Sequence, residues 1–215
     1  MSRRGLFLCL DGVDGAGKTT QCQLLAAWLT QQQYTVTLCR DPGSTTVSER
    51  IRAILLDKTL TLDAITEALL FMASRAALLD QVVRPALDAG QIVVIDRYIW
   101  STIAYQGHAG TLPLAEVRSF AAHAVRNLLP DLTLILDVPT AVCTTRQSQK
   151  HVDRIEAKGP TYLEKVRQGY LAEAACQPAR LRVLDATQTV AQVQAAIRHH
   201  VDHLLLTWRA PHDLS

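Results

Sequence analysis

Five short apolar runs, separated by long segments with helical periodicity, constrain the fold of this chain most strongly. The runs are GLFLCL, YTVTLC, QIVVI, LTLIL and RLRVL, and each is rich in Val, Ile or Leu. Continuous apolar runs are typical of strands buried on both faces, and strands that alternate with helices form parallel sheets. We therefore predict an α/β fold with a five-stranded parallel sheet and helices on both of its faces.

The chain length of 215 residues is enough for one α/β domain with a sizeable core and leaves little room for a second. We expect a single domain over 1–215. A formal net charge of +2 is too small to indicate a nucleic-acid-binding surface, so nucleic acid is excluded as an expected partner. No apolar segment approaches the roughly 20 residues that a membrane span requires, so we expect no membrane association.

The five cysteines are scattered and form no CxxC pair. This pattern favours neither a disulfide framework nor a zinc site. We therefore expect reduced thiols in a cytoplasmic protein.

Polar residues follow each apolar run. Four of the runs are followed by an acid, and the second run is followed by an arginine and an acid. In chain order these residues are Asp11, Arg40 with Asp41, Asp96, Asp137 and Asp185. In open parallel sheets, ligands bind outside the carboxyl ends of the strands. These side chains are therefore expected to surround the functional site.

A phosphate-binding loop follows the first apolar run. Gly12, Gly17, Lys18 and Thr19 fit the pattern GxxxxGK[ST] between a strand and a helix. In such a loop the backbone N–H groups surround phosphates, the lysine reaches the β and γ oxygens, and the hydroxyl binds Mg²⁺. The predicted contacts to the ATP phosphates are Gly12, Val13, Asp14, Gly15, Ala16, Gly17, Lys18, Thr19 and Thr20.

A second acid on the metal side is expected at the end of another buried strand. Asp137 is followed by Pro139, which suits the first turn of a helix, so Asp137 has an alternative role in starting that helix. Asp96 is followed directly by Arg97, which places a metal ligand beside a cation for phosphate oxygens. We prefer Asp96, and the alternative for this dipeptide is a local ion pair.

Arginines outside the loop predict a second phosphate-bearing ligand, since the guanidinium recognises phosphate with two parallel hydrogen bonds. Arg40 and Arg52 are placed for this role. Phe71 and Arg75 lie one helical turn apart and could offer a stacking face and a donor to a base carbonyl. The alternative for Phe71 is core packing.

The segment 63–89 has helical periodicity. Its apolar stripe, predicted to face the core, comprises Leu69, Met72, Ala76, Leu79 and Val83.

The sequence as a whole resembles the thymidylate kinase family, in which DGVDGAGKTT, RDPGST, LLFMASR, DRYIWSTIAYQG, PDLTLILDV and VDRIE recur in the same order. The resemblance covers residues 5–186. It implies the fold of P-loop nucleoside monophosphate kinases with a short mobile lid at about 143–158. It also implies ATP-dependent phosphorylation of dTMP to dTDP in nucleotide biosynthesis, with Mg²⁺, by a homodimer.

The same resemblance implies roles for individual residues toward dTMP. Asp14 would reach the sugar hydroxyl and the acceptor phosphate. Phe71 would stack on thymine and Arg75 would bind its carbonyl. Arg52 and Arg97 would hold the acceptor phosphate, with Arg97 also near the transferring group.

Further along the chain, the resemblance implies that Ser101 and Gln106 face the base and that Tyr105 lies under the sugar. The stretch 146–154 matches the lid, with Arg146, Lys150 and Arg154 as the cations available to ATP. Which of the three contacts ATP stays open. The chain departs from the family pattern REPGGT, since it reads RDPGST, and its lid reads TTRQSQKHVDRIE.

Phosphoryl transfer to such an acceptor needs no general base. A phosphate monoester has a second pKa of about 6, so its oxygen is already anionic at neutral pH. Asp96 is therefore interpreted as a ligand of Mg²⁺ or its water, and Lys18, Arg97 and a lid cation as the groups that neutralise charge.

Two alternatives stay open at this point. One is another kinase, acting on a different nucleoside monophosphate or on a deoxynucleoside; a deoxynucleoside would require a true general base. The other is a nucleotide-dependent switch, although the NKxD motif with which guanine switches read their base is missing from this sequence.

Overall fold

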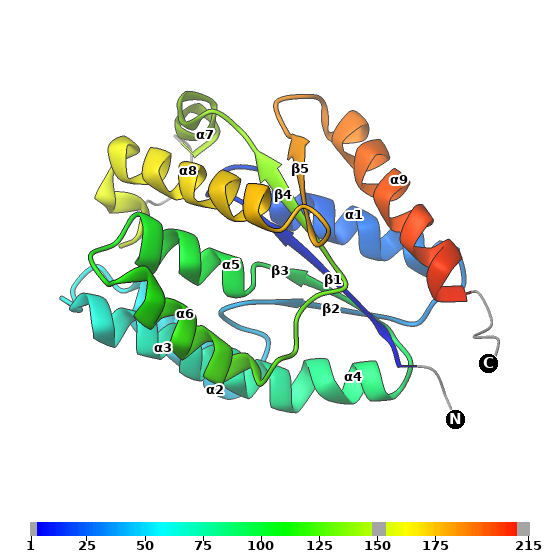
Figure 1. Cartoon of the computed structure of the whole chain (residues 1–215), viewed down its shortest axis with the longest axis horizontal. Helices are drawn as coiled ribbons and strands as arrows, with labels where there is room; N and C mark the ends of the chain where they lie inside the picture. Colours follow the sequence, from blue (N-terminus) through cyan, green and yellow to red (C-terminus); the bar gives the residue numbers. More distant parts are fainter. Residues whose placement is uncertain (1–3, 148–153, 210–215) are drawn as a thin grey trace.

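The computed structural model describes residues 4–147 and 154–209. Over these ranges the chain forms a five-stranded sheet in which all neighbouring strands are parallel, which confirms the predicted fold class (Figure 1). The strands are β1 (Leu6–Asp11), β2 (Val36–Arg40), β3 (Ile92–Asp96), β4 (Leu132–Asp137) and β5 (Leu181–Asp185). Their order in the sheet is β2-β3-β1-β4-β5.

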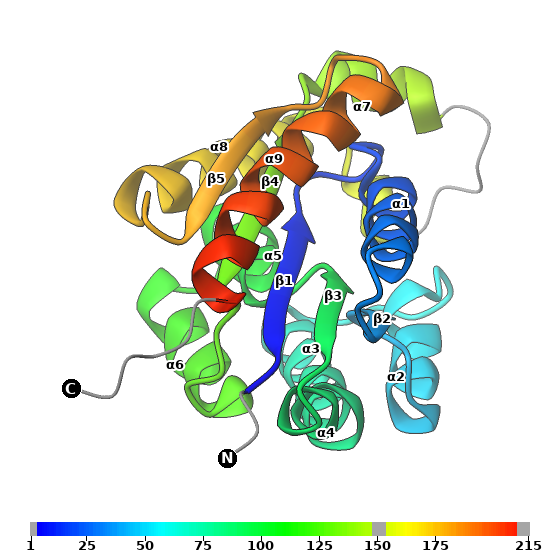
Figure 2. The same ribbon diagram turned by 90° about the vertical axis from the view of Figure 1, so that its right-hand side faces the viewer.

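Helices connect the strands and cover both faces of the sheet. They are α1 (Lys18–Gln31), α2 (Thr46–Leu56), α3 (Ala64–Leu78), α4 (Arg84–Asp88), α5 (Ile99–Thr102), α6 (Leu114–Val125), α7 (Thr140–Gln147), α8 (Pro160–Cys176) and α9 (Val190–Arg209). Two π-helical segments, η1 (Leu79–Val83) and η2 (Ile103–His108), and one 3-10 turn, η3 (Glu156–Lys158), complete the elements in the described ranges. The helices α1 and α9 pack together on one face, and α4 and α8 lie on the other (Figure 2).

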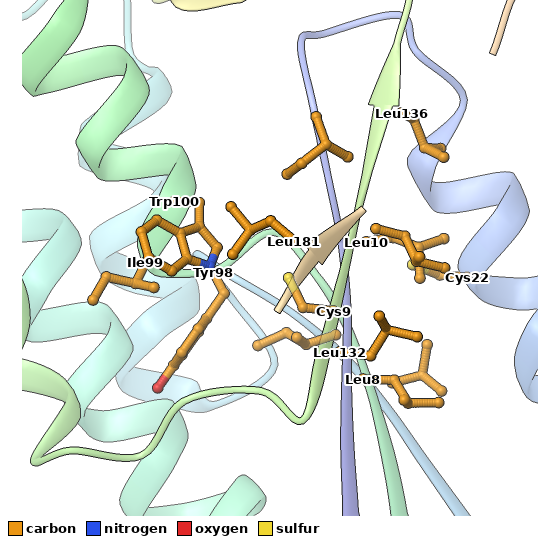
Figure 3. Close-up of a cluster of buried hydrophobic side chains, with 14 of the residues drawn as sticks. Leu8, Cys9, Leu10, Cys22, Tyr98, Ile99, Trp100, Leu132, Leu136 and Leu181 are labelled. Atoms are coloured by element: carbon orange, nitrogen blue, oxygen red, sulfur yellow. The ribbon is translucent and has the colours of Figure 1, made fainter. Parts of the chain in front are cut away.

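The central strand β1 shows why the runs are continuously apolar. All of its residues are buried, because helices cover both sides of the sheet. Leu8 and Leu10 lie on the side of α1 with Cys22, and Cys9 lies on the opposite side with Tyr98 (Figure 3). None of the helices in the described part of the chain is long and apolar enough to cross a membrane.

The carboxyl ends of the strands meet at one edge of the sheet. Leu10 is level with Asp96 of β3, and Asp96 is level with Arg40 of β2. The chain leaves β1 into α1 and leaves β3 into α5, which lie on opposite faces, so a crevice opens between these two strands. The polar residues that follow the apolar runs are thereby brought to the mouth of this crevice.

The segment predicted as a helix over 63–89 is helical from residue 64 to residue 88, with a π-helical stretch inside it, and the predicted core position of Leu69 is wrong. The chain forms α3, widens into η1 and continues as α4, in which Pro85 lacks an N–H and crowds the carbonyl one turn earlier. Met72, Leu79 and Val83 are buried as predicted, whereas Leu69 is 48% exposed. The inward positions of the first turns are occupied by Ala68 and by polar side chains.

Candidate active site

The loop between β1 and α1 has the backbone geometry of a phosphate cradle. Gly12 and Gly17 have φ angles of 137° and 90°, which favour glycine, and a Cβ on Gly12 would lie 2.5 Å from the Leu136 carbonyl oxygen. The N-terminus of α1 follows directly, with its unpaired N–H groups. Lys18 is buried and its Nζ donates to the Val13 carbonyl at 2.8 Å. This end of α1 is therefore suited to an anion.

A cavity of about 480 Å³ lies against the loop. Six of the predicted phosphate contacts line it, namely Asp14, Gly15, Gly17, Lys18, Thr19 and Thr20. Gly12, Val13 and Ala16 are buried in the loop instead. They shape the cradle without forming the wall of the cavity.

Thr19 and Asp96 converge at this cavity. The Thr19 Oγ1 donates to Asp96 Oδ2 at 2.6 Å, and both residues line the cavity. Asp137, the alternative acid, accepts two hydrogen bonds from Arg167 of α8 at 2.7 and 2.9 Å. The geometry therefore favours Asp96 as the acid beside the loop.

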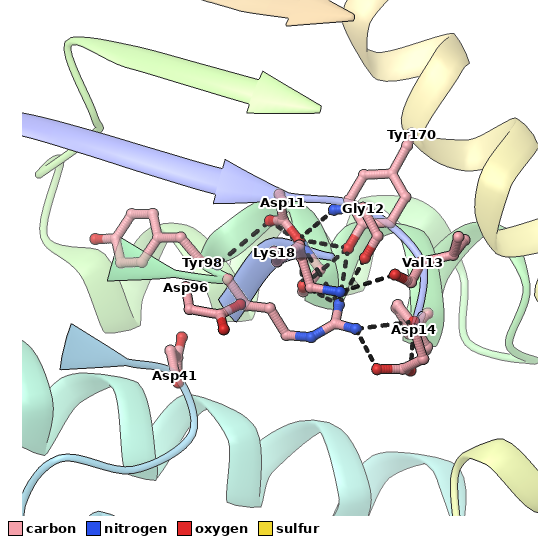
Figure 4. Close-up of polar contacts among 12 residues, drawn as sticks. Asp11, Gly12, Val13, Asp14, Lys18, Asp41, Asp96, Tyr98 and Tyr170 are labelled. Atoms are coloured by element: carbon pink, nitrogen blue, oxygen red, sulfur yellow. Dashed lines mark hydrogen bonds and ion pairs between the residues drawn. The ribbon is translucent and has the colours of Figure 1, made fainter. Parts of the chain in front are cut away.

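Arg97 follows directly after β3 and contacts the loop after β1. Figure 4 shows how Asp11, Gly12, Asp14 and Asp96 lie around this position. Its Nη2 donates to Asp14 at 2.6 Å, and its Nη1 donates to the Gly12 carbonyl and to Ser101, each at 3.0 Å. Its backbone φ of 70° is unusual for an arginine and is found where surrounding contacts over-determine a conformation. Among the described residues, Arg97 thus pairs with Asp14 at 2.6 Å and with Asp11 at 3.8 Å, whereas the local alternative pairs it with Asp96.

The charges of Arg97 and Asp14 are stabilised together. Burial alone would raise the pKa of Asp14, but the charges of Arg97 and Lys18 and a hydrogen bond from Tyr105 lower it to about 2. Burial would likewise lower the pKa of Arg97, and the Asp14 carboxylate raises it well above its usual value. Both side chains are therefore ionised over the physiological pH range.

Asp11 is a site residue whose function the sequence did not reveal. Its carboxylate is fully buried and accepts hydrogen bonds from the backbone N–H groups of Gly12, Tyr98 and Ser101 at 3.0, 3.3 and 3.1 Å. The hydroxyls of Ser101 and Tyr170 donate to it at 2.6 Å each. Asp11 thus ties β1, the turn after β3 and α8 together beneath Arg97. Ser101, expected at the base, has its hydroxyl in this network.

A second, narrower cavity continues from the first. Asp14, Asp41, Arg52 and Arg97 line both cavities, so the two meet at these residues. The other predicted acceptor residues also line it, namely Phe71, Arg75, Ser101, Tyr105 and Gln106. The structure therefore brings together, in one cavity, residues from α2, α3, α5 and η2 that lie far apart in the sequence.

Arg75 is anchored in the wall of the second cavity. It is 1% exposed, and its Nε donates to Asp41 in a buried ion pair. Its Nη2 donates to the Tyr98 carbonyl at 3.1 Å and to Thr102 Oγ1 at 3.0 Å. The Nη1 contacts the Met72 sulfur at 3.7 Å, a weak acceptor. Nη1 is therefore the donor that Arg75 can offer to a ligand.

The loop after β2 contains Asp41 and Ser44, the two residues at which RDPGST departs from the family pattern REPGGT. The shorter Asp41 is buried against Arg75, and burial raises its pKa while the Arg75 charge opposes that shift. The Ser44 hydroxyl accepts a hydrogen bond from the Arg40 N–H at 2.9 Å. Arg52 donates to the Pro42 carbonyl at 3.1 Å.

The predicted lid cations are only partly within the described residues. Lys150 and the side chain of Arg146 lie outside them. Arg154 pairs with Glu67 of α3 at 2.7 Å and donates to the Leu55 carbonyl at 2.9 Å. Arg154 thus lies near the second cavity and not near the phosphate loop. Lys158 also pairs with Glu67 there, at 3.0 Å.

Comparisons with known proteins agree with this arrangement. A sequence model of the family "Thymidylate kinase" matches residues 10–197. The thymidylate kinase of Symbiobacterium thermophilum is 40% identical over 201 residues, covering 93% of this chain and 94% of the relative. That of Ectopseudomonas mendocina is 45% identical over 195 residues, covering 90% and 93%.

A solved structure gives the same result for the fold. The crystal structure of thymidylate kinase from Ehrlichia chaffeensis superposes with a TM-score of 0.76 at 29% identity, covering 92% of this chain and 99% of that protein. The chain belongs to the thymidylate kinase family.

Proposed function

We propose that this chain, a kinase of the thymidylate kinase family, phosphorylates dTMP to dTDP with ATP in the larger cavity and dTMP in the narrower one. The observation that carries the proposal is the meeting of the two cavities at Asp14 and Arg97. A switch protein needs only one nucleotide cavity, whereas a kinase needs a donor and an acceptor site that share a boundary. Formation of ADP from ATP only when the acceptor is present tests this proposal.

The reaction follows from the charges at that boundary. An acceptor phosphate oxygen attacks the γ-phosphorus, the bond to the β–γ bridging oxygen breaks, and ADP leaves with the electron pair. Arg97 and Lys18 lie where negative charge accumulates on the transferring group. Asp14, which is also among the predicted phosphate contacts, holds Arg97 at 2.6 Å and lines the acceptor cavity.

Thr19 and Asp96 fit a magnesium ion. They provide two hard oxygen ligands 2.6 Å apart beside the phosphate loop, and Mg²⁺ is commonly held by few protein oxygens together with water and phosphates. When bound, the ion would neutralise charge on the β and γ phosphates. The protein would contribute the Thr19 hydroxyl directly and Asp96 directly or through water.

Phe71→Ala is expected to raise the KM for dTMP about tenfold or more and to leave the KM for ATP nearly unchanged. Phe71 lines only the second of the two cavities, and loss of base stacking costs about 1–3 kcal/mol. Steady-state kinetics with each substrate varied in turn measures both constants. An unchanged KM for dTMP would assign Phe71 to core packing alone.

We further propose a homodimer that uses the exposed apolar face of α3 and its neighbour α2. Ile65 and Leu69 are 44% and 48% exposed one turn apart on α3, and Val47 and Ile54 of α2 are 47% and 40% exposed. Large apolar side chains gathered on two neighbouring helices indicate a protein contact. A second copy of the chain is the occupant, since a twofold interface places the same patch of both copies in contact and an apolar patch is complementary to itself.

Leu69→Glu is expected to weaken this dimer at least about tenfold, because it places a charge in an apolar contact. Leu206→Glu is the matched control, since Leu206 is 70% exposed on α9. Sedimentation velocity over a concentration series measures the dissociation constant. A monomeric parent chain, or equal weakening by both variants, would contradict the proposal.

The cytoplasm is the proposed compartment, supported by the state of the thiols. Burial raises the pKa of Cys39 to about 12 and the pKa values of Cys9 and Cys22 above their usual value. These thiols are therefore protonated and unreactive, as suits a reducing environment.

A further inference from the structure

Glu67 is a buried carboxylate to which the proposed reaction assigns no role. It lies on α3 one turn before Phe71 and is 3% exposed. Its Oε1 accepts from the Gln106 Nε2 at 2.9 Å and pairs with Lys158 at 3.0 Å. Its Oε2 pairs with Arg154 at 2.7 Å. One side chain thus joins α3, η2 and the segment that begins at residue 154.

The surroundings of Glu67 keep it ionised. Burial by itself would raise its pKa, but the hydrogen bond from Gln106 and the charges of Lys158 and Arg154 lower it. Two cations within ion-pair distance of one carboxylate offset the cost of its burial. An ionised carboxylate can only accept hydrogen bonds.

The ionised Glu67 fixes the orientation of the Gln106 amide. The two ends of an amide side chain have nearly the same shape, so only their hydrogen-bond partners decide which end points where. Facing a carboxylate, the amide must present its NH₂ group, as the 2.9 Å contact shows. The amide oxygen is left for a ligand in the narrower cavity, which Gln106 lines.

The second cavity therefore offers a defined pair of polar groups. Arg75 offers a donor through Nη1, and Gln106, whose NH₂ group is turned to Glu67, offers an acceptor through Oε1. Thymine presents a carbonyl oxygen at O4 and a donor at N3–H, which complements this pair. Cytosine presents an amino group and an unprotonated N3. Its amino donor would meet the Arg75 donor, and its N3 acceptor would meet the Gln106 acceptor.

We propose that Glu67 is a positioning residue for base selection: by holding the Gln106 amide in one orientation, it makes the acceptor cavity favour bases that carry an N3–H over cytosine. The proposal rests on the proposed function for the location of dTMP. It adds the residue that determines the polarity of the base site. Glu67 itself contacts neither the base nor the phosphates.

The variant Glu67→Gln tests the proposal at nearly constant shape. The amide introduced at position 67 can donate as well as accept, so the Gln106 amide becomes free to turn. The ratio of kcat/KM for dTMP to that for dCMP is expected to fall at least about tenfold, the effect of one buried hydrogen bond that is lost or mismatched. The preference for dTMP over dCMP in binding, taken from dissociation constants measured calorimetrically without ATP, is expected to fall by the same factor.

A double variant provides the rescue. In Glu67→Gln combined with Gln106→Glu the two groups are exchanged: the amide on α3 donates to the carboxylate on η2, and the second oxygen of that carboxylate still accepts from N3–H. The preference for dTMP is expected to return at least in part. Lys158→Met is the matched control; it removes an ion pair to Glu67, leaves Arg154 and Gln106 in contact with it, and is expected to keep the wild-type ratio.

Equal loss for dTMP and dCMP in Glu67→Gln would overturn the proposal, because a merely structural carboxylate would affect both nucleotides alike. If Glu67→Gln does not fold, Gln106→Leu decides, since an unchanged base preference in that variant would also overturn it. Failure of the proposed function is distinct: the wild-type protein would then form no ADP with dTMP. If the wild-type protein is active on dTMP and the variants keep the wild-type ratio, only the role of Glu67 is refuted.

Discussion

Arg97→Ala is expected to lower kcat by about 10³-fold while the KM for ATP changes by only a few fold. An arginine that stabilises charge on the transferring phosphoryl group contributes on this order to kcat. Arg97 is positioned for this role because Asp14, the Gly12 carbonyl and Ser101 hold its guanidinium between the two cavities. ATP keeps Lys18 and the backbone of the loop, so its binding depends little on Arg97.

Steady-state kinetics and calorimetric ATP binding together measure this separation. Arg126→Ala is a suitable control, since Arg126 also has a positive φ, of 47°, and lies on the surface beside Asp80. It is expected to leave both constants unchanged. Equal losses in ATP affinity and in turnover for Arg97→Ala would show that Arg97 binds ATP in the ground state and is not used mainly in the transition state.

Asp11→Ala is expected to lower the free energy of unfolding by about 3–5 kcal/mol, the cost of breaking a buried charged network. The substitution removes one acceptor and leaves the N–H groups of Gly12, Tyr98 and Ser101 and the Tyr170 hydroxyl without it. Gly12, Tyr98 and Tyr170 are buried, so water does not replace their lost partner. Because Ser101 also contacts Arg97 at 3.0 Å, kcat is expected to fall as well.

Denaturant unfolding of Asp11→Ala and Asp185→Ala isolates this effect. Asp185 also ends a strand, but it is exposed, and within the described part of the chain its carboxylate bonds to Thr187 and Gln188 of its own turn. Its replacement is expected to cost less than about 1 kcal/mol. A similar small cost at Asp11 would contradict the view that this carboxylate holds the site together.

The strands and the phosphate loop could be predicted because their causes are local. A run such as QIVVI must be buried on both faces, and GAGKTT encodes its own turn through glycines that adopt positive φ angles. The grouping of Phe71, Arg75 and Gln106 came instead from the family resemblance. Neither composition nor periodicity places η2 beside α3.

Contacts between distant residues explain most of what the sequence did not predict. Tyr170 reaches Asp11 across 159 positions, and no spacing rule links a helix tyrosine to the end of the first strand. Leu69 was assigned to the core because apolar periodicity cannot tell a core face from an exposed one. Glu67 takes an inward position because Gln106, Arg154 and Lys158 are there to satisfy it.

In the proposed reaction, two cavities that meet at Arg97 hold ATP and dTMP for direct transfer. The most direct measurement is the rate of ADP formation from ATP with a panel of acceptors: dTMP, dUMP, dCMP, dGMP, thymidine and no acceptor. We expect rapid ADP formation with dTMP, less with the other monophosphates and only background with thymidine, which lacks the phosphate that Arg97 is placed to hold. ADP formation independent of any acceptor, or fastest with thymidine, would contradict direct transfer from ATP to dTMP.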